Sequence, residues 1–180
     1  MLYLFLGSLA SILFQPEIRG GNTTSVSSNA QVQPVRTISV SECKFDSTKL
    51  HLIPGLGAGG VSLSWTQFNI PGYSEEEIDS APSASIKLKL SKGRRTIELM
   101  CVPTHAVYIG SALRTAIRLG DSPPAIVDVD TPSGTETWSN NVVRGYVSAR
   151  AVFIIKEEGM VNLKLSFLDS GLAMSKILIY

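Results

Sequence analysis

The sequence has few of the residues from which disulfide frameworks and metal sites are built. Its 180 residues include two cysteines, Cys43 and Cys101, and two histidines. Two cysteines cannot form a disulfide scaffold, and together with two histidines they are a thin supply of metal ligands. We therefore expect neither a metal site nor a cofactor. Both cysteines lie in apolar segments, which favours buried thiols, and a disulfide between them is the alternative in an oxidising compartment.

The sequence also has little excess charge of either sign. Sixteen Lys and Arg residues face fifteen Asp and Glu residues, which leaves a net charge of +1. This balance excludes a uniform electrostatic attraction to nucleic acid but permits a local basic patch. Hydrophobic residues make up 44% and charged residues 17% of the chain, as in a globular domain that can bury a core.

The apolar run at the N-terminus, residues 1–14, is too short to span a membrane, which takes about 20 residues. Three interpretations remain open: a signal-peptide core, with a glycosylation sequon at Asn22; a membrane-dipping or self-association segment; or an element docked on the core. The polar residues that follow predict a flexible arm. We therefore divide the chain into an apolar segment and arm, residues 1–37, and a single globular domain, residues 38–180.

The stretch from Gly55 to Gly60 contains the pattern G-x-G-x-x-G. In a dinucleotide-binding fingerprint a helix follows these glycines and its N-terminus holds the pyrophosphate. Here residues 61–66 alternate between apolar and polar, which indicates a strand. We therefore predict a loop that joins two strands, residues 48–53 and 61–68, and no nucleotide site.

Alternation predicts most of the remaining structure, with one helix. Further strands are expected over residues 85–90 and 125–129, and the last third has the outline of a hairpin, with strands 143–155 and 161–167. Residues 96–102 form an apolar run that ends at Pro103, and residues 172–180 are either a strand or a packed helix. Apolar residues between Tyr108 and Arg118 recur at helical spacing, with Thr104 as N-cap and Gly120 as the stop. Residues 131–141 are expected to be a polar loop. The predicted fold class is α+β, mainly antiparallel sheet with one packed amphipathic helix and a flexible N-terminal arm.

The insert between Pro71 and Pro82 is acidic and has its own local signal. Ser74 and Glu77 have the spacing of a capping box. We expect one exposed helical turn there.

No arrangement of residues predicts catalysis. The G-x-S-x-G nucleophile motif is incomplete around Ser62. His51 alternates with leucines, as on a strand face, and His105 lies at the start of the predicted helix. Asp128 and Asp130 share one side of a short strand, which fits either a carboxylate pair or a strand that runs into a solvated loop. We expect a protein that is not an enzyme.

One basic cluster rises above the background, in the sequence KLKLSKGRR. Apolar residues alternate with its first two lysines, so the charges are expected on the solvent side of a strand and at the adjoining turn; they are Lys87, Lys89, Lys92, Arg94 and Arg95. Such a patch suits an anionic membrane or the phosphates of a nucleoprotein, and the alternative is a solvated edge strand. Arg114 and Arg118 share a face of the predicted helix and are candidate additional contacts.

The order of these features resembles the core of rhabdovirus matrix proteins of the small, plant-infecting type. The resemblance rests on a lysine-alternating strand, a basic turn, a helix entry, a helix end and a terminal hairpin: Ile86–Leu90, Arg94–Thr96, Val107–Gly110, Leu119–Pro123 and Tyr146–Phe167. It implies a structural protein that self-associates, condenses the viral nucleocapsid and bridges it to an anionic membrane, with a viral glycoprotein tail as a further partner. Its place would be the virion and the host cytoplasm or nucleus with their membranes. The alternative is a β-sandwich, either a viral capsid domain or a secreted binding domain, because many short alternating strands are expected.

Overall fold

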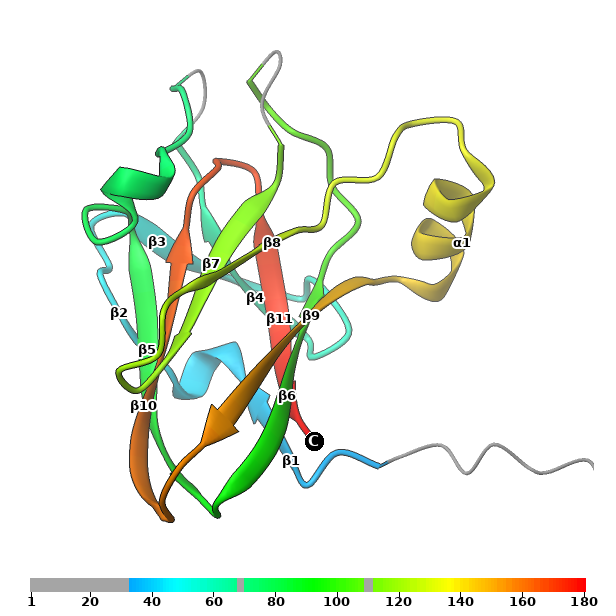
Figure 1. The fold of residues 1–180 in the computed structure, drawn as a ribbon. Coiled ribbons are helices and arrows are strands. Elements are labelled where there is room, and N and C mark those ends of the chain that lie inside the picture. The colour runs from blue at the N-terminus through cyan, green and yellow to red at the C-terminus, as the bar shows by residue number, and fades with distance from the viewer. Residues whose placement is uncertain (1–32, 68–69, 109–111) are drawn as a thin grey trace, which may run out of the picture. The chain divides into compact units, whose positions relative to one another are not determined.

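The computed structural model describes residues 33–67, 70–108 and 112–180, whose strands form two antiparallel sheets packed face to face (Figure 1). The interpretations of residues 1–14 and of the sequon at Asn22 lie outside the described residues. No helix in the described part of the chain is both long and apolar enough to cross a membrane.

The larger sheet has the strand order β3-β4-β11-β6-β9, and β1 pairs with the second half of β11. Its strands are β1 (Arg36–Ser39), β3 (Leu50–Pro54), β4 (Val61–Trp65), β6 (Gly93–Cys101), β9 (Val147–Ile155) and β11 (Ala173–Ile179).

The smaller sheet has the order β2-β5-β10-β7-β8. Its strands are β2 (Lys44–Phe45), β5 (Ser83–Leu90), β7 (Arg114–Leu119), β8 (Ala125–Asp128) and β10 (Gly159–Phe167). The described helices are short: α1 (Glu136–Arg144) and the 3-10 turns η1 (Val40–Glu42) and η2 (Glu75–Glu77).

The core lies between the two sheets and follows the period of two in the strands. In β10, Leu163, Leu165 and Phe167 are almost fully buried. They face the inward residues of the other sheet, such as Ile97 and Ile177. Side chains from two inner faces that interdigitate in this way are the basis of a β-sandwich. The predicted fold class, mainly antiparallel sheet with one helix, is confirmed.

The position of the predicted helix was wrong. The part of the range 108–118 that the structure describes includes the start of β7, and residues 109–111 lie outside the described residues. Thr115, Ile117 and Leu119 are buried, whereas Arg118 faces out, a period of two. Ala116 and Ile117 satisfied the helical and the strand pattern equally, and the pairing with β8 and β10 decided between them. The helix occurs instead as α1, where a polar loop was expected.

The predicted hairpin at residues 143–167 was also wrong in its pairing. Both strands exist, as β9 and β10, but β9 pairs with β6 and β10 pairs with β5 and β7. The turn at residues 156–158 therefore crosses from one sheet to the other (Figure 1). The alternation of each strand showed that one face is buried but could not show which strand lies beside it.

The glycine-rich loop joins two strands, as predicted. β3 pairs antiparallel with β4 across residues 55–60, and Gly55 N–H donates to the Gly60 carbonyl at 2.8 Å. Both glycines have positive φ, 77° and 72°, a backbone conformation that glycine adopts at little cost. The segment after Gly60 is the strand β4 and not the helix that a dinucleotide fingerprint requires.

The acidic insert forms the predicted turn and lies on the outer face of the smaller sheet. Ser74 N–H donates to Glu77 Oε2 at 2.9 Å, which is half of a capping box. Ile78 packs against Ala116 of β7. Asp79 forms ion pairs with Arg118 at 2.8 Å and Lys164 at 3.0 Å.

Both cysteines are free and buried, as predicted. Burial raises the pKa of the Cys43 thiol to about 11 and that of Cys101 to about 12. The thiolate is the reactive form, so neither residue should react with iodoacetamide at pH 8 while the protein is folded. Mass spectrometry with and without urea tests this, and an adduct on the folded protein would contradict it.

Candidate functional site

Four connections meet at one end of the sandwich, which we call the loop end (Figure 1). They are the described parts of residues 66–82, 102–113, 129–146 and 168–172, which follow β4, β6, β8 and β10. Binding residues are often carried on loops that a rigid scaffold positions. The loop end is therefore the first place to examine for a site.

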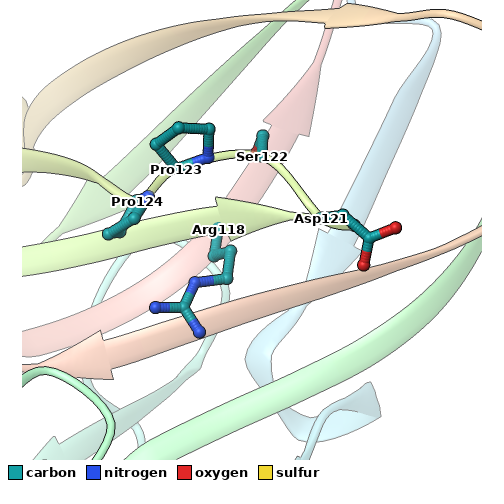
Figure 2. Close-up of a pocket in the computed structure, with 6 residues that line it drawn as sticks. Arg118, Asp121, Ser122, Pro123 and Pro124 are labelled. Atoms are coloured by element: carbon teal, nitrogen blue, oxygen red, sulfur yellow. The ribbon is translucent and has the colours of Figure 1, made fainter.

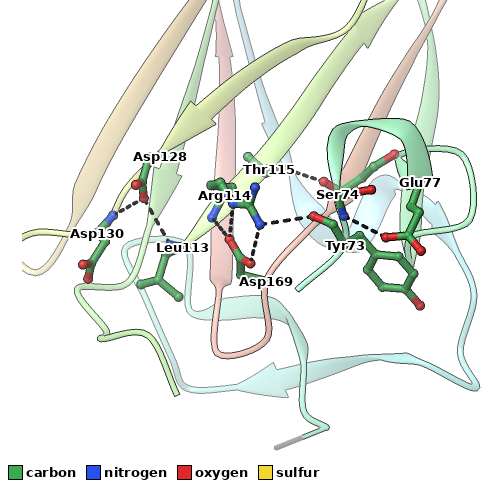
Figure 3. Close-up of polar contacts among 10 residues, drawn as sticks. Tyr73, Ser74, Glu77, Leu113, Arg114, Thr115, Asp128, Asp130 and Asp169 are labelled. Carbon is green, nitrogen blue, oxygen red and sulfur yellow. Dashed lines mark hydrogen bonds and ion pairs between the residues drawn. The ribbon is translucent and has the colours of Figure 1, made fainter. Parts of the chain in front are cut away.

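A buried ion pair holds the loop end together (Figure 3). Asp169 is 1% exposed and accepts hydrogen bonds from the backbone N–H and Nε of Arg114, each at 2.8 Å, and from its Nη2 at 2.9 Å. The hydrogen bonds to Asp169 raise the pKa of Arg114. Arg114 Nη2 also donates to the Tyr73 carbonyl at 3.1 Å. The carboxylate of Asp169 and the guanidinium of Arg114 form their hydrogen bonds with each other and with the backbone. We therefore assign this pair to the scaffold of the site and not to the ligand.

A second tie joins the connections from β6 and β10. The Thr104 hydroxyl donates to the Gly171 carbonyl at 3.0 Å, and Gly171 N–H donates to the Trp65 carbonyl at 3.3 Å. The ring of Trp65 lies 5.5 Å from that of Tyr73. The described connections are thus bound to one another as well as to the strands.

An aromatic stack forms part of the loop-end surface. The rings of His105 and Trp138 lie nearly parallel, with centroids 5.4 Å apart and an interplanar angle of 13°. Trp138 lies in the first turn of α1, where its backbone N–H donates to the hydroxyl of the N-cap residue Thr135 at 3.1 Å. The buried Trp138 Nε1 has no acceptor among the residues that the structure describes.

Acidic and aromatic groups lie next to this stack. Asp130 Oδ1 is 4.0 Å from His105 Nδ1, and 44% of the His105 side chain is exposed. Asp128 accepts N–H groups from Asp130 at 2.8 Å and Leu113 at 3.1 Å, so it shapes the loop (Figure 3). Tyr108, further along the same connection as His105, is 41% exposed. Exposed flat rings beside a carboxylate can hold a ligand that has both apolar faces and hydroxyl groups.

The five residues of the predicted basic patch do not share one face. β5 belongs to the smaller sheet and β6 to the larger one, so the turn between them crosses the sandwich. Lys87 and Lys89 project outward from β5, whereas Arg94 projects outward from β6. Lys92 lies in the turn between these strands. Arg95 is on β6, and its Nη1 donates to the Arg94 carbonyl. Lys89 also forms an exposed ion pair with Glu158 at 3.6 Å.

The other predicted residues are also dispersed. Arg114 and Arg118 lie on β7 and pair with Asp169 and Asp79. His51 is exposed on β3, a strand face as predicted. A shallow hollow at the turn between β7 and β8 is lined by Arg118, Gly120 and residues 121–124 (Figure 2). No aromatic residue lines it, which makes it a weaker candidate than the loop end.

Sequence reasoning missed the stack and the Arg114–Asp169 pair. The helix that carries Trp138 did have a local signal, because Thr135 is an N-cap residue and Gly145 stands at the C-terminal position that favours positive φ. No local pattern indicated that His105 would stack on Trp138 or that Asp169 would pair with Arg114, because the two residues of each pair are far apart in the sequence.

Residues 39–180 match the family described as glycosyl hydrolase family 115 C-terminal domain. No curated protein showed a match to the sequence. A family GH115 4-O-methyl-alpha-glucuronidase with specificity for decorated arabinogalactans has a similar structure, with a TM-score of 0.66 and 19% identity over 84% of this chain. This chain spans 18% of the length of that protein.

Carbohydrate-binding modules have the same fold. A family 35 module from Clostridium thermocellum aligns with a TM-score of 0.55 and 11% identity, over 81% of this chain and 98% of the module. A family 6 module from a Cellvibrio mixtus lichenase, solved with cellotriose, aligns with a TM-score of 0.51 and 10% identity, over 82% of this chain and 97% of the module. At these identities the likeness shows the fold.

These findings overturn the resemblance to rhabdovirus matrix proteins. The family match covers most of the chain, whereas the resemblance rested on the order of elements, one of which, the helix, is absent from its expected place. The matrix function was therefore wrong, together with its partners (nucleocapsid, anionic membrane, viral glycoprotein tail and self-association) and its place in the virion and host cell. The findings favour the alternative, a β-sandwich binding domain.

Proposed function

Because the chain belongs to the glycosyl hydrolase family 115 C-terminal domain family, we propose that it is a carbohydrate-binding domain that holds a saccharide at the loop end. We propose further that it works as the non-catalytic part of a longer glucuronidase-type hydrolase, in the periplasm or outside the cell, where polysaccharides are found. The observation that carries the proposal is the stack of His105 on Trp138 beside Asp130, with Tyr108 in the same connection.

The chemistry of a saccharide suits these groups. A pyranose ring presents C–H groups on its faces, which pack on a flat aromatic ring, and hydroxyl groups at its edge, which donate to a carboxylate. His105 and Tyr108 supply exposed rings, and Asp130 supplies a partly exposed carboxylate. The ties through Asp169 and Thr104 hold these connections in place before a ligand binds, which lowers the entropic cost of binding.

The carboxylates of the loop end support a binding role rather than bond cleavage. Hydrolysis of a glycoside usually requires two carboxyl groups that face the scissile bond from opposite sides. Asp128 and Asp169 accept hydrogen bonds from backbone N–H groups and from Arg114, so they are committed to the scaffold. Asp130 is the carboxylate that we assign to the ligand.

Replacing His105 or Tyr108 with alanine should weaken saccharide binding by at least about tenfold, because each change removes one of the two exposed rings that we assign to the ligand. Titration calorimetry with an arabinogalactan oligosaccharide measures the affinity, and intrinsic fluorescence, to which Trp138 and the buried Trp65 contribute, gives a second signal. The melting temperature should change little, since both residues lie at the surface and neither belongs to the buried core.

The matched control is His51→Ala, which removes an exposed histidine from β3, away from the stack. It should bind the oligosaccharide as the unchanged protein does. Equal affinity of the His105, Tyr108 and His51 variants would refute the loop-end site.

A further inference from the structure

The histidine of the loop end faces a carboxylate and lies against a tryptophan ring. His105 Nδ1 is 4.0 Å from Asp130 Oδ1, and the His105 ring is nearly parallel to that of Trp138, with the centroids 5.4 Å apart. His105 belongs to the connection between β6 and β7, whereas Asp130 and Trp138 belong to the connection between β8 and β9. The charge of the imidazole therefore acts on two groups of the neighbouring connection.

The charge of a histidine depends on pH in the range where proteins are used. An imidazole gains a proton as the pH falls from 8 to 5, whereas an aspartate side chain ordinarily stays ionised over that range. The side chains of His105 and Asp130 are 44% and 31% exposed. Water reaches both groups, so the imidazole can exchange its proton with the solvent.

The charge that faces His105 is negative. Asp130 is its charged partner among the described ion pairs. Asp128 accepts the backbone N–H of Asp130 at 2.8 Å and adds a second negative charge to the same connection (Figure 3). On the connection that follows β10, Asp169 is paired with Arg114 at 2.8 Å. A proton on His105 therefore places a positive charge next to a carboxylate.

Protonation strengthens both contacts of the His105 ring. The imidazolium and the Asp130 carboxylate form an ion pair, which is modest in strength because both groups are partly exposed. A cation is also attracted to the electron-rich face of an aromatic ring, and the indole of a tryptophan gives the strongest contact of this kind. The protonated ring is thus held more firmly against Asp130 and Trp138 than the neutral ring.

The same two contacts compete with a saccharide. We assigned the Asp130 carboxylate to sugar hydroxyl groups and the His105 ring to the C–H groups of a sugar face. An ion pair with His105 engages the carboxylate that would otherwise accept those hydroxyl groups. A cationic ring also lacks the electron-rich face on which C–H groups pack. Both effects weaken binding in the protonated state.

We propose that His105 is a pH switch of the loop end, which on protonation pairs with Asp130 and loosens the hold on the saccharide. The inference rests on the proposed function of the loop end and adds the regulation of that site. The domain holds its ligand at neutral and weakly basic pH and releases it more readily in an acidic medium.

Titration calorimetry of the unchanged protein with the arabinogalactan oligosaccharide, at pH 8 and at pH 5, is the first test. We expect the affinity to be about fivefold weaker at pH 5, as exposed ion pairs and cation–π contacts allow. Equal affinity at the two pH values would refute the switch. Without ligand, the indole N–H resonance of Trp138 should shift along with the titration of the His105 ring protons.

Two substitutions separate the proton from the ring. His105→Phe keeps a flat ring that takes no proton, so its affinity should be the same at pH 5 and pH 8. Asp130→Asn keeps groups that bond to sugar hydroxyls but removes the charged partner, so it should reduce the pH dependence. The NMR titration uses the unchanged protein and stays informative even if a variant fails to fold.

His51→Ala is the matched control, because it removes the other histidine of the chain, which is exposed on β3. It should keep the full pH dependence. If the dependence persists in His105→Phe or disappears in His51→Ala, the switch does not lie at His105.

The switch and the loop-end site fail in different ways. Binding at pH 8 that His105→Ala loses, together with an unchanged affinity at pH 5 in the parent protein, refutes the switch alone. Equal binding by His105→Ala, or no binding at either pH, refutes the loop-end site and the switch with it.

Discussion

Replacing Asp169 with alanine is expected to lower the free energy of unfolding by about 3 kcal/mol, because it leaves the Arg114 guanidinium without its carboxylate in a largely buried place. The change also removes the acceptor of the Arg114 backbone N–H. The Arg114 side chain is 31% exposed and can recover some hydration, which limits the loss to the lower part of the range for broken buried pairs. Urea denaturation measures it.

Asp79→Ala is the control for this substitution. Asp79 contacts two cations, Arg118 and Lys164, but its side chain is 67% exposed. An exposed pair contributes little because water screens it, so the Asp79 variant should lose much less stability than the Asp169 variant. If the Asp79 and Asp169 variants lose equal stability, the burial argument for Asp169 is wrong.

Replacing Gly72 with alanine is expected to lower the free energy of unfolding by about 2 kcal/mol, within the range for overpacking. The added methyl group would overlap Asp169 Oδ1 and come within 2.9 Å of the Leu168 carbonyl oxygen. The carboxylate must then move away from Arg114, so saccharide binding at the loop end should weaken as well. Thermal unfolding and calorimetry measure the two effects.

Gly159→Ala is the matched control, because nothing lies within 4 Å of the methyl group that it adds. Its stability should stay within about 0.5 kcal/mol of that of the unchanged protein. An unchanged stability of the Gly72 variant would show that the connection before β5 can yield, against the rigid loop end described above.

Strands were predictable where the pattern within a single segment was enough. Residues in β5 and β10 alternate between apolar and polar, and each segment is a strand. The pattern failed for β7, where Ala116 and Ile117 suited either period. It also failed for α1, because its capping residues, Thr135 and Gly145, lie in or next to a polar stretch that was interpreted as a loop. In both places the local signal was weak and the tertiary contacts decided.

Binding residues were harder to predict than strands. Lys87 and Arg94 are close in the sequence, and for that reason they were assigned to one patch, although a sheet-to-sheet turn separates their faces. Arg114 and Asp169 are 55 residues apart and share one buried pair. Proximity along the chain was therefore a poor guide to proximity in space.

The amino-acid pattern was sufficient to predict a mainly antiparallel sheet with one helix, the strands on either side of the glycine-rich loop and the burial of Cys43 and Cys101, since each depends on residues within a few positions of one another. Tertiary structure alone decided that β9 and β10 lie in different sheets, that His105 stacks on Trp138 and that Asp169 pairs with Arg114. The physical reason is that alternation states which face of a strand is buried, whereas the choice of neighbour depends on how all the strands fill one core.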